Sequence, residues 1–249
     1  MSFDRLLDHR RLWKEKAVLP RVYGVWFDEL LDTIGPRRRV LEIGAGPGLL
    51  SAYAKEADPS RLWIATDILE TPWNALVVDG GRLPVKSGSI DAVAAFDLIH
   101  HLADPRAFFE EAARVLAPGG RMVVVEPWVT PFSYPIYRFL HEEGCTLGLD
   151  PWDPFGVAKG GSKAAFTGDA AVVSRLVRTT PSETWRALGF GAPQVRLLNG
   201  FAYLLSGGFQ PYSLLPQGLV GAFQGLDRWT TALSPLFALR ALALWDRAS

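Results

Sequence analysis

The sequence has very little cysteine and no formal net charge. Cys145 is the single cysteine among 249 residues, which excludes an internal disulfide framework and favours a reducing compartment. Lys plus Arg and Asp plus Glu both number 26, so no overall field draws the protein toward nucleic acid or anionic lipid. With four histidines and no ligand-spaced cluster of His and Cys, the sequence predicts no metal site.

A targeting signal and a continuous membrane span are also missing. Residues 1–16 are rich in charge and lack the apolar core of a secretion signal, which predicts a cytoplasmic protein. Residues 197–226 carry no formal charge and exceed the roughly 20 residues that cross a bilayer, but Gly, Pro, Asn and Gln interrupt them. We therefore expect no transmembrane span and leave contact with a membrane surface open.

What the chain does contain is an apolar strand that runs into a glycine-rich turn. Residues 40–48 read Val-Leu-Glu-Ile-Gly-Ala-Gly-Pro-Gly, and residues 49–57 have helical character. Glycine permits positive φ and close approach of the backbone to a ligand, which the free N–H groups at the helix start also face. The spacing Gly-x-Gly-x-Gly differs from the Gly-x-Gly-x-x-Gly of dinucleotide-binding folds. A nucleotide-like ligand is expected here.

Three acids follow at the ends of later predicted strands. The expected strands are 61–66, 73–78, 89–97 and 121–126. Asp67 ends the first of these at the distance where a carboxylate reaches ribose hydroxyls, with a helix cap or turn as the alternative. Asp79 alone would be interpreted as a turn residue before a glycine pair. Because ligands of open α/β sheets bind beyond the carboxyl ends of the strands, Asp97 is expected at the same site.

These motifs together resemble those of class I S-adenosylmethionine-dependent methyltransferases over residues 39–206, including a Leu-x-Pro-Gly-Gly passage at 116–120. The resemblance implies a Rossmann-like α/β fold with a seven-stranded sheet, mostly parallel with its last strand antiparallel, and helices on both faces. It implies S-adenosyl-L-methionine as cofactor and S-adenosyl-L-homocysteine as product. It places Glu42, Gly44, Ala45, Gly46 and Gly48 at the amino-acid end of the cofactor, Asp67 and Ile68 at the ribose, Asp79 and Gly80 at the adenine, and Asp97 and Leu98 at the methyl donor.

We expect a single domain with a core over residues 36–206. An N-terminal helix over 4–31, interrupted at Pro20, is either a lid over the cofactor or a helix packed on the sheet edge. A helix is expected after Asp104 and another over 181–190. An insertion at 127–180 caps the substrate, and it contains a basic glycine-rich loop at 158–163, either a phosphate site or a flexible surface loop.

The last two strands are expected at 194–198 and 201–205, followed by a helical extension over 207–249. Leu219, Phe223, Leu226 and Leu233 trace one helical face, and a second helix is predicted to start at Ser234 and run through Trp245. Packing in the core or contact in a homodimer is favoured for this face over a peripheral membrane contact.

Candidate catalytic residues follow the fourth strand and lie in the insertion. His101 is the preferred general base, because imidazole titrates near neutral pH, and His100, His141 and Glu142 are further candidates. Hydrogen bonding of these histidines to the backbone is the alternative. Trp128, Tyr134 and Tyr137 are the candidate substrate-binding residues of the insertion.

The resemblance implies a methyltransferase acting on a small-molecule, saccharide or lipid-linked acceptor. Nucleic acid is not an expected partner, because Phe96-Asp97-Leu98-Ile99 stands where many nucleic-acid amino-methylating relatives have an Asn-Pro-Pro-Tyr type sequence. Two alternatives remain: a cofactor-binding protein without catalysis, and an NAD-dependent oxidoreductase, which the glycine spacing disfavours.

Overall fold

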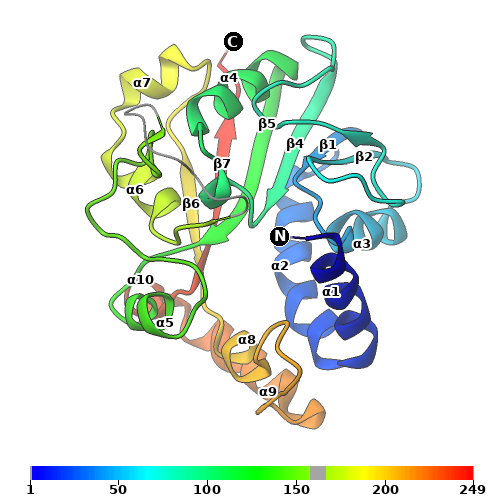
Figure 1. Cartoon of the computed structure of the whole chain (residues 1–249), viewed down its shortest axis with the longest axis vertical. Coiled ribbons are helices and arrows are strands. Elements are labelled where there is room, and N and C mark those ends of the chain that lie inside the picture. Colours follow the sequence, from blue (N-terminus) through cyan, green and yellow to red (C-terminus); the bar gives the residue numbers. More distant parts are fainter. Residues whose placement is uncertain (1, 158–166, 249) are drawn as a thin grey trace.

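The computed structural model describes residues 2–157 and 167–248 of the chain. These residues form a seven-stranded sheet in the order β3-β2-β1-β4-β5-β7-β6, with helices on both faces (Figure 1). The strands are β1 (Arg39–Ile43), β2 (Leu62–Asp67), β3 (Leu76–Val77), β4 (Ile90–Phe96), β5 (Leu116–Pro127), β6 (Gln194–Leu198) and β7 (Arg240–Asp246). Strands β1 to β5 are parallel, and β7 is antiparallel to both neighbours. The predicted Rossmann-like sheet is confirmed.

Helices connect the strands and precede the sheet. They are α1 (Phe3–Glu15), α2 (Val18–Ile34), α3 (Leu49–Ala57), α4 (Pro105–Val115), α5 (Ser133–Phe139), α6 (Val172–Thr179), α7 (Ser182–Ala187), α8 (Phe201–Ser206), α9 (Val220–Trp229) and α10 (Ser234–Phe237), with short 3₁₀ helices η1 (Ile99–His101), η3 (Gln217–Leu219) and η4 (Thr231–Leu233). None of the helices in the described part of the chain is both long and apolar enough to cross a membrane.

Each face of the sheet has its own apolar core. Val40 of β1 packs with α2 on one face, whereas the next residue, Leu41, packs with α4 on the other. Successive side chains of a strand point to opposite faces, and both faces are covered here. The parallel strands therefore read as continuous apolar runs.

The helix termini confirm the predicted start of α4 and correct the predicted interruption of the N-terminal helix. Asp104 caps α4 by accepting a hydrogen bond from Ala107 N at 3.0 Å, and Pro105 occupies the first turn. The N-terminal helical segment is interrupted at Lys16 and Ala17 instead of at Pro20. Pro20 lies in the first turn of α2, where its missing N–H leaves no helical hydrogen bond unmade.

The last strand of the sheet is not where the sequence places it. Residues 201–205 form helix α8, not a strand, and the helix predicted through Trp245 ends at Phe237. Strand β7 follows and inserts between β5 and β6, so that Ala243 pairs with both Val124 and Val195. The sheet thus extends well beyond residue 206. The expected third strand is also shorter than predicted, because β3 consists of only two residues at the sheet edge.

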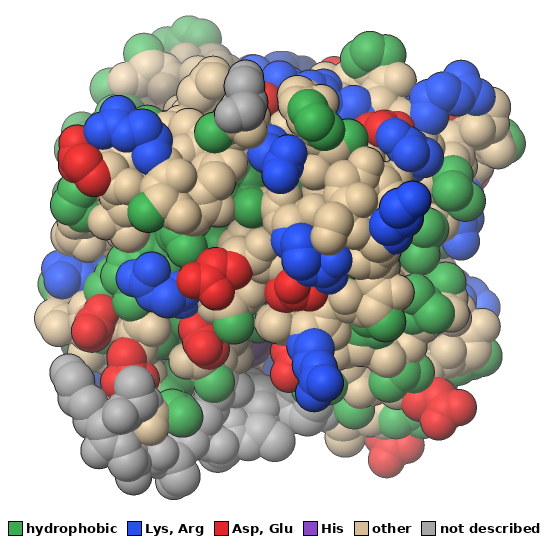
Figure 2. Space-filling view, turned by 90° about the horizontal axis from the view of Figure 1, so that it is seen from above, with side chains coloured by type: hydrophobic (Ala, Val, Ile, Leu, Met, Phe, Trp, Pro, Cys, Tyr) green, Lys and Arg blue, Asp and Glu red, His purple; other side chains and the backbone are tan. Residues whose placement is uncertain are grey.

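The two ends of the molecule differ in surface chemistry. The parallel strands begin at the upper end of Figure 1, where the view from above shows basic and acidic side chains interspersed (Figure 2). Ion pairs such as Arg39 with Asp91 at 2.5 Å and Arg121 with Asp246 at 2.9 Å lie there. The carboxyl ends of the parallel strands point to the lower end, together with α5, α8, α9 and α10. The loop at 158–163, predicted either to hold phosphate or to be flexible, lies outside the described residues.

Candidate active site

The glycine turn, residues 44–48, joins β1 to α3 and needs glycine for two reasons. Gly44, Gly46 and Gly48 have φ of 72°, 52° and 70°, values that side-chain-bearing residues rarely adopt. A Cβ on Gly44 would lie 2.6 Å from Leu98 Cδ1, and one on Gly48 would lie 2.5 Å from Trp73 Cδ1. The turn therefore brings bare backbone next to the residues that follow β4.

Asp67 ends β2 and is tied to the glycine turn. Its Oδ2 accepts a hydrogen bond from Gly46 N at 2.7 Å, and its Oδ1 accepts one from Leu69 N at 2.9 Å. The side chain is nearly buried, whereas the neighbouring Ile68 is exposed. Each carboxylate oxygen keeps a second lone pair, so the predicted ribose contact is compatible with this arrangement and stays a prediction.

Glu42 and Asp79 lie in contrasting surroundings. Glu42 is buried and accepts a hydrogen bond from Trp63 Nε1 at 2.5 Å. Burial raises the pKa of Glu42 to about 7, although the indole N–H opposes the shift. Asp79 is exposed and accepts a hydrogen bond from Gly81 N at 2.9 Å, the geometry of the turn aspartate. The contacts predicted for both carboxyls stay predictions.

Trp73 and helix α1 cover the glycine turn. The indole Nε1 of Trp73 donates to Gly46 O at 2.8 Å, and the ring of Phe3 stacks on the indole at 6.0 Å. Arg10 places its guanidinium 4.3 Å from the same indole and donates to Pro47 O at 2.6 Å. Helix α1 therefore lies on the glycine turn, whereas α2, the second part of the predicted helix, packs against the sheet. That α1 is a lid over the cofactor stays a prediction.

At the end of β4, Asp97 pairs with a buried arginine that the sequence did not point to. Asp97 has φ of 54°, a positive value for a residue other than glycine, and its carboxylate binds Arg240 of β7. The guanidinium of Arg240 lies 4.7 Å from the ring centre of Trp26 and 5.2 Å from that of Tyr203. Sequence reasoning missed Arg240 because its segment was predicted to be helical.

The two histidines of η1 meet two carboxylates, from β5 and from the insertion. Nδ1 of His100 lies 2.5 Å from Glu126, and its Nε2 lies 3.1 Å from Glu143. Burial alone would lower the pKa of His100, but the two carboxylates outweigh it and raise the pKa to about 10. His100 is therefore a cation at neutral pH and is unsuited to accept a proton.

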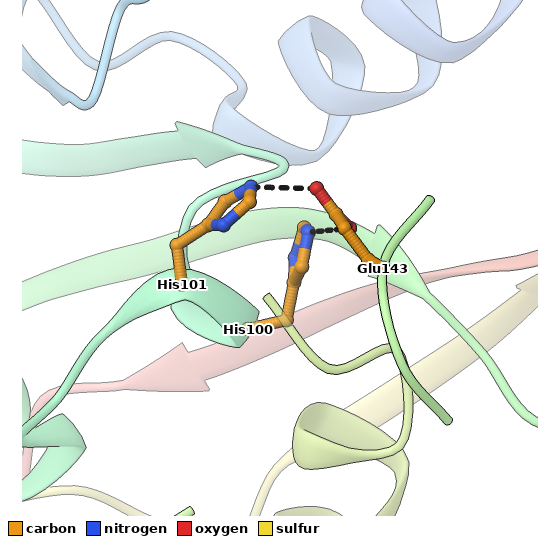
Figure 3. Close-up of side chains that lie close together, drawn as sticks. All are labelled: His100, His101 and Glu143. Atoms are coloured by element: carbon orange, nitrogen blue, oxygen red, sulfur yellow. Dashed lines mark hydrogen bonds and ion pairs between the residues drawn. The ribbon is translucent and has the colours of Figure 1, made fainter. Parts of the chain in front are cut away.

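His101 has the opposite character. Its Nε2 lies 3.3 Å from Glu143 Oε1, and its Nδ1 is buried without a hydrogen-bond partner among the described residues (Figure 3). Burial and the charge of His100 lower the pKa of His101, which is thus neutral at neutral pH. Because Glu143 favours the tautomer with the proton on Nε2, Nδ1 is left as an unengaged acceptor.

Glu143 connects all three candidate histidines. Burial alone would raise the pKa of Glu143, but the hydrogen bond from His100 and the charges of the histidines lower it to about 2. His141 is more exposed, and its Nδ1 lies 3.8 Å from the same carboxylate. Gly168 passes over this group so closely that a Cβ would lie 2.8 Å from His101 Nδ1 and 2.9 Å from Glu143 Cδ. We call His100, His101, His141, Glu126 and Glu143 the histidine cluster.

The histidine cluster also bears on the predicted absence of a metal site. His100, His101 and Glu143 bring potential ligand atoms within 4.8 Å of one another, a proximity that the sequence spacing did not indicate. Glu143 already contacts both His100 and His101, at 3.1 and 3.3 Å. That no metal is needed stays a prediction.

The candidate acceptor-binding aromatics of the insertion lie mostly in the interior. Trp128 is buried against Ala238 and Ala241. Tyr137 is buried, and its hydroxyl donates to Leu239 O. Tyr134 is partly buried beside the core. An acceptor contact stays a prediction for all three.

Comparison with known proteins matches the part of the chain that carries the cofactor motifs. The family model described as "Methyltransferase domain" matches residues 41–124, which run from β1 through the glycine turn, Asp67 and the histidines of η1 into β5. The chain contains a class I S-adenosylmethionine-dependent methyltransferase domain. Helix α1, Glu143 and Arg240 lie outside the matched residues.

The alignments with relatives include only part of this chain and only part of each relative. A demethylmenaquinone methyltransferase of Beutenbergia cavernae is 35% identical over 123 residues, which are 44% of this chain and 51% of the relative. An uncharacterized methyltransferase of Mycobacterium sp. (strain JLS) is 30% identical over 162 residues, or 57% of this chain and 61% of the relative. The chain thus spans about half to three fifths of the length of these two relatives.

Solved structures share the fold of the methyltransferase domain at low identity. Geranyl diphosphate C-methyltransferase from Streptomyces coelicolor superposes with a TM-score of 0.54 at 15% identity, covering 92% of this chain and 78% of that one. Phosphoethanolamine N-methyltransferase 2 of Haemonchus contortus gives 0.52 at 14% identity, covering 100% and 60%. At such identity the likeness concerns the fold.

The residues present fit the cofactor of this family. The backbone of the glycine turn lies so close to Leu98 and Trp73 that a Cβ on Gly44 or Gly48 would meet them, and the carboxylate of Asp67 is bound to Gly46 N in the same turn. Sequence reasoning missed Glu126, Glu143, Arg240 and Trp73 as members of the site. For Glu126 a signal existed, since a carboxylate at the end of a buried parallel strand lies at the ligand edge of the sheet.

Proposed function

We propose that the domain transfers the methyl group of S-adenosylmethionine to a hydroxyl group of a small-molecule or lipid-linked acceptor. Two relatives support an oxygen acceptor by name. They are a ubiquinone biosynthesis O-methyltransferase of Caulobacter sp., 29% identical over 158 residues, and a malonyl-[acyl-carrier protein] O-methyltransferase of Hahella chejuensis, 31% identical over 99 residues.

The arrangement of His101 carries the proposal. The bound cofactor supplies a methyl carbon activated by the sulfonium, so its C–S bond breaks as the acceptor O–C bond forms and the hydroxyl proton needs a base. Nδ1 of His101 accepts that proton, because it is unengaged and the ring is neutral. Glu143 stabilises the imidazolium that forms, from 3.3 Å away on Nε2.

The other members of the site orient the reactants and exclude water. In this proposal the glycine turn and Glu42 would hold the amino-acid end of the cofactor, Asp67 would bind the ribose and Asp79 the adenine. Asp97 and Leu98 would hold the methyl-donor end, and a Cβ on Gly44 would meet Leu98, three residues before His101. His100 keeps a fixed positive charge next to the base and lowers its pKa. His141 lies at the exposed side of the cluster.

The test compares His101→Ala with His141→Ala in a methyl-transfer assay with labelled cofactor and a panel of phenolic and quinol acceptors. We expect His101→Ala to lower turnover about 10²–10⁴-fold with unchanged affinity for S-adenosylhomocysteine by calorimetry, and His141→Ala to change it little. Unchanged turnover and pH profile in His101→Ala would contradict the base role. Tight binding of S-adenosylhomocysteine without methyl transfer to the panel or a cell extract would favour the non-catalytic alternative.

A further inference from the structure

The segment between β6 and β7 leaves a row of apolar side chains exposed. Five of them, at spacings of seven, three, four and three residues along η3, α9, η4 and α10, are exposed: Leu219, Leu226, Trp229, Leu233 and Leu236. Trp229 is 81% exposed. The sequence expectation of core packing is therefore wrong for Leu219, Leu226 and Leu233, whereas Phe223 of the same predicted face packs against the apolar cluster around the buried Val220. Contact in a homodimer stays a prediction. We call the five exposed residues the apolar stripe.

The polar residues of the same segment are engaged on the inner side. The carboxylate of Asp227 accepts hydrogen bonds from the backbone N–H groups of Phe201 and Ala202 at 2.8 and 3.3 Å, which caps α8. Asn199 donates to Thr230 Oγ1 at 2.8 Å, and Thr230 is buried. Rotating the segment to bury the apolar stripe would break these bonds. The outward apolar face is therefore fixed by the fold.

Further apolar side chains extend the stripe across the lower end of the molecule. Tyr212 and Leu214, the latter 71% exposed, lie in the loop before η3. Lys16 orders that loop, because its ammonium donates to the carbonyls of Ser206, Gly208, Gln210 and Tyr212 at 2.7 to 3.0 Å. Phe139 and Leu140, both at least 75% exposed, end α5 at the same end of the molecule (Figure 1). Backbone pairing of Phe132 with Leu236 at 3.1 Å links the start of α5 to α10.

Charges around this surface are predominantly basic. Between residues 197 and 239 the only formal charges are Asp227 and Arg228, and the carboxylate of Asp227 faces inward. Arg228 is exposed beside Trp229, and Arg21 and Arg138 are exposed on adjoining elements. Arg21 donates to Gln217 O at 2.9 Å, at the edge of the apolar stripe. Glu142, an exposed acid nearby, pairs with Arg5 at 2.7 Å. The opposite end of the molecule mixes both signs (Figure 2).

We propose that the apolar stripe, with Leu214, Phe139 and Leu140, rests on an anionic lipid bilayer in the plane of its interface. Apolar side chains next to exposed arginines match the acyl and headgroup layers of such a surface. Leu140 directly precedes His141 and Glu143 of the histidine cluster, so this surface adjoins the candidate active site. A second copy of the chain on the same face would cover that approach, whereas a bilayer would deliver an apolar acceptor to it. The surface itself does not depend on the proposed methyl transfer.

The test is flotation of the full chain, without cofactor or acceptor, with vesicles of phosphatidylcholine and phosphatidylglycerol at 7:3. We expect the wild type to float with these vesicles and several-fold less with pure phosphatidylcholine. Trp229→Gln and Leu219→Gln should each lower the partition coefficient about tenfold, as expected for one large apolar side chain leaving a buried position. Leu62→Gln is the control matched to Leu219→Gln, because Leu62 is 55% exposed against 48% for Leu219 but lies at the opposite end of the sheet.

Each outcome decides the proposal. Flotation that falls with Trp229→Gln and Leu219→Gln but not with Leu62→Gln supports it, as does release of the wild type by salt. No flotation with anionic vesicles, or equal losses in all three variants, overturns it. A dimer in sedimentation that Trp229→Gln dissociates, without vesicle binding, overturns it in favour of self-association. All three side chains are exposed, so the variants are expected to fold, and circular dichroism checks this.

Discussion

Glu143 Oε1 lies 3.3 Å from His101 Nε2, although the two residues come from separate segments, η1 and the loop after α5. The contact favours the tautomer with the proton on Nε2 and leaves the buried Nδ1 without a hydrogen-bond partner among the described residues. The role of Glu143 is therefore to position and polarise the proposed base.

Replacing Glu143 should lower turnover without weakening cofactor binding. In Glu143→Gln the amide carries no charge to stabilise the imidazolium, and its NH₂ group can donate to Nε2 and so favour the other tautomer. We expect a loss of at least about tenfold in kcat; loss of the carboxylate behind a catalytic histidine costs up to about 10⁴-fold in a serine protease. Glu142→Gln is the matched control, because Glu142 pairs with Arg5 outside the cluster. Equal rates for the two variants would remove Glu143 from the mechanism.

The pH dependence of the reaction should carry the signature of a neutral histidine. Burial and His100 lower the pKa of His101, while Glu143, Glu126 and Asp97 act in the opposite direction. We expect kcat/KM to be constant near neutral pH and to fall only below about pH 6.5, the usual histidine value. The acidic limb should be absent from the residual activity of His101→Ala. A limb centred above pH 7 would contradict the assignment.

How much of this site is predictable from sequence depends on how locally each feature is determined. The glycine turn follows from backbone conformation between one strand and one helix, and Asp67 from its place at a strand end. Both are properties of a few consecutive residues. The fit of Glu143 to His101 instead requires the insertion to fold back over η1, with Gly168 leaving room for it. No local pattern marks Glu143.

Strand β7 shows a different limit of sequence patterns. Leu239, Leu242 and Trp245 recur at a helical spacing, yet the segment is a strand buried on both faces. In such a strand the alternation of polar and apolar residues disappears, so periodicity does not separate strand from helix. The pairing of β7 with β5 and β6 decides its structure, and with it the position of Arg240.

Stability should fall across the alkaline range because of His100. Its pKa is about 10 in the folded protein against 6.5 for an unperturbed histidine, so the fold binds the proton more tightly than the unfolded chain. The stabilisation that protonated His100 contributes is complete below pH 6.5 and is lost as pH rises through 10. We expect the free energy of unfolding, measured in urea, to decline over this window in the wild type and to be flatter in His100→Gln. Parallel pH profiles would contradict this linkage.

Ionisation of Glu42 should lower the stability of the protein over a lower pH range than the loss of the His100 proton. Its carboxyl has a pKa of about 7 in the fold against 4.5 for an unperturbed glutamate, so the folded protein holds the proton longer. The stabilisation is complete below pH 4.5 and is lost by pH 7, with a slope of up to about 1.4 kcal/mol per pH unit. Glu42→Gln keeps an acceptor for Trp63 and should gain stability relative to the wild type between pH 5 and 8. A difference in the free energy of unfolding between the wild type and Glu42→Gln that stays constant with pH would disprove this prediction.

The glycine turn offers a comparison that separates strain from steric conflict. Gly44 and Gly119 have nearly the same φ, 72° and 73°, but a Cβ on Gly44 meets Leu98 at 2.6 Å whereas nothing lies within 4 Å of one on Gly119. Gly119→Ala should cost about 1 kcal/mol from positive φ alone. Gly44→Ala should cost clearly more and should also weaken binding of S-adenosylhomocysteine in calorimetry. Equal costs with unchanged binding would mean that the turn needs no close approach.

The pair of Asp97 and Arg240 should show strong coupling in a double-mutant cycle. Arg240 is buried among aromatic rings, and removing one partner of a buried ion pair leaves an uncompensated charge, at a cost of about 3–5 kcal/mol. Arg240→Met and Asp97→Asn should therefore each destabilise the protein in urea unfolding. Asp97→Asn should cost more, because it leaves the buried guanidinium unpaired, whereas the carboxylate left by Arg240→Met is partly exposed. The double variant should be less destabilised than the sum of the single ones, since no charge is then left unpaired. Additive effects would show that the aromatic rings, not Asp97, stabilise the guanidinium.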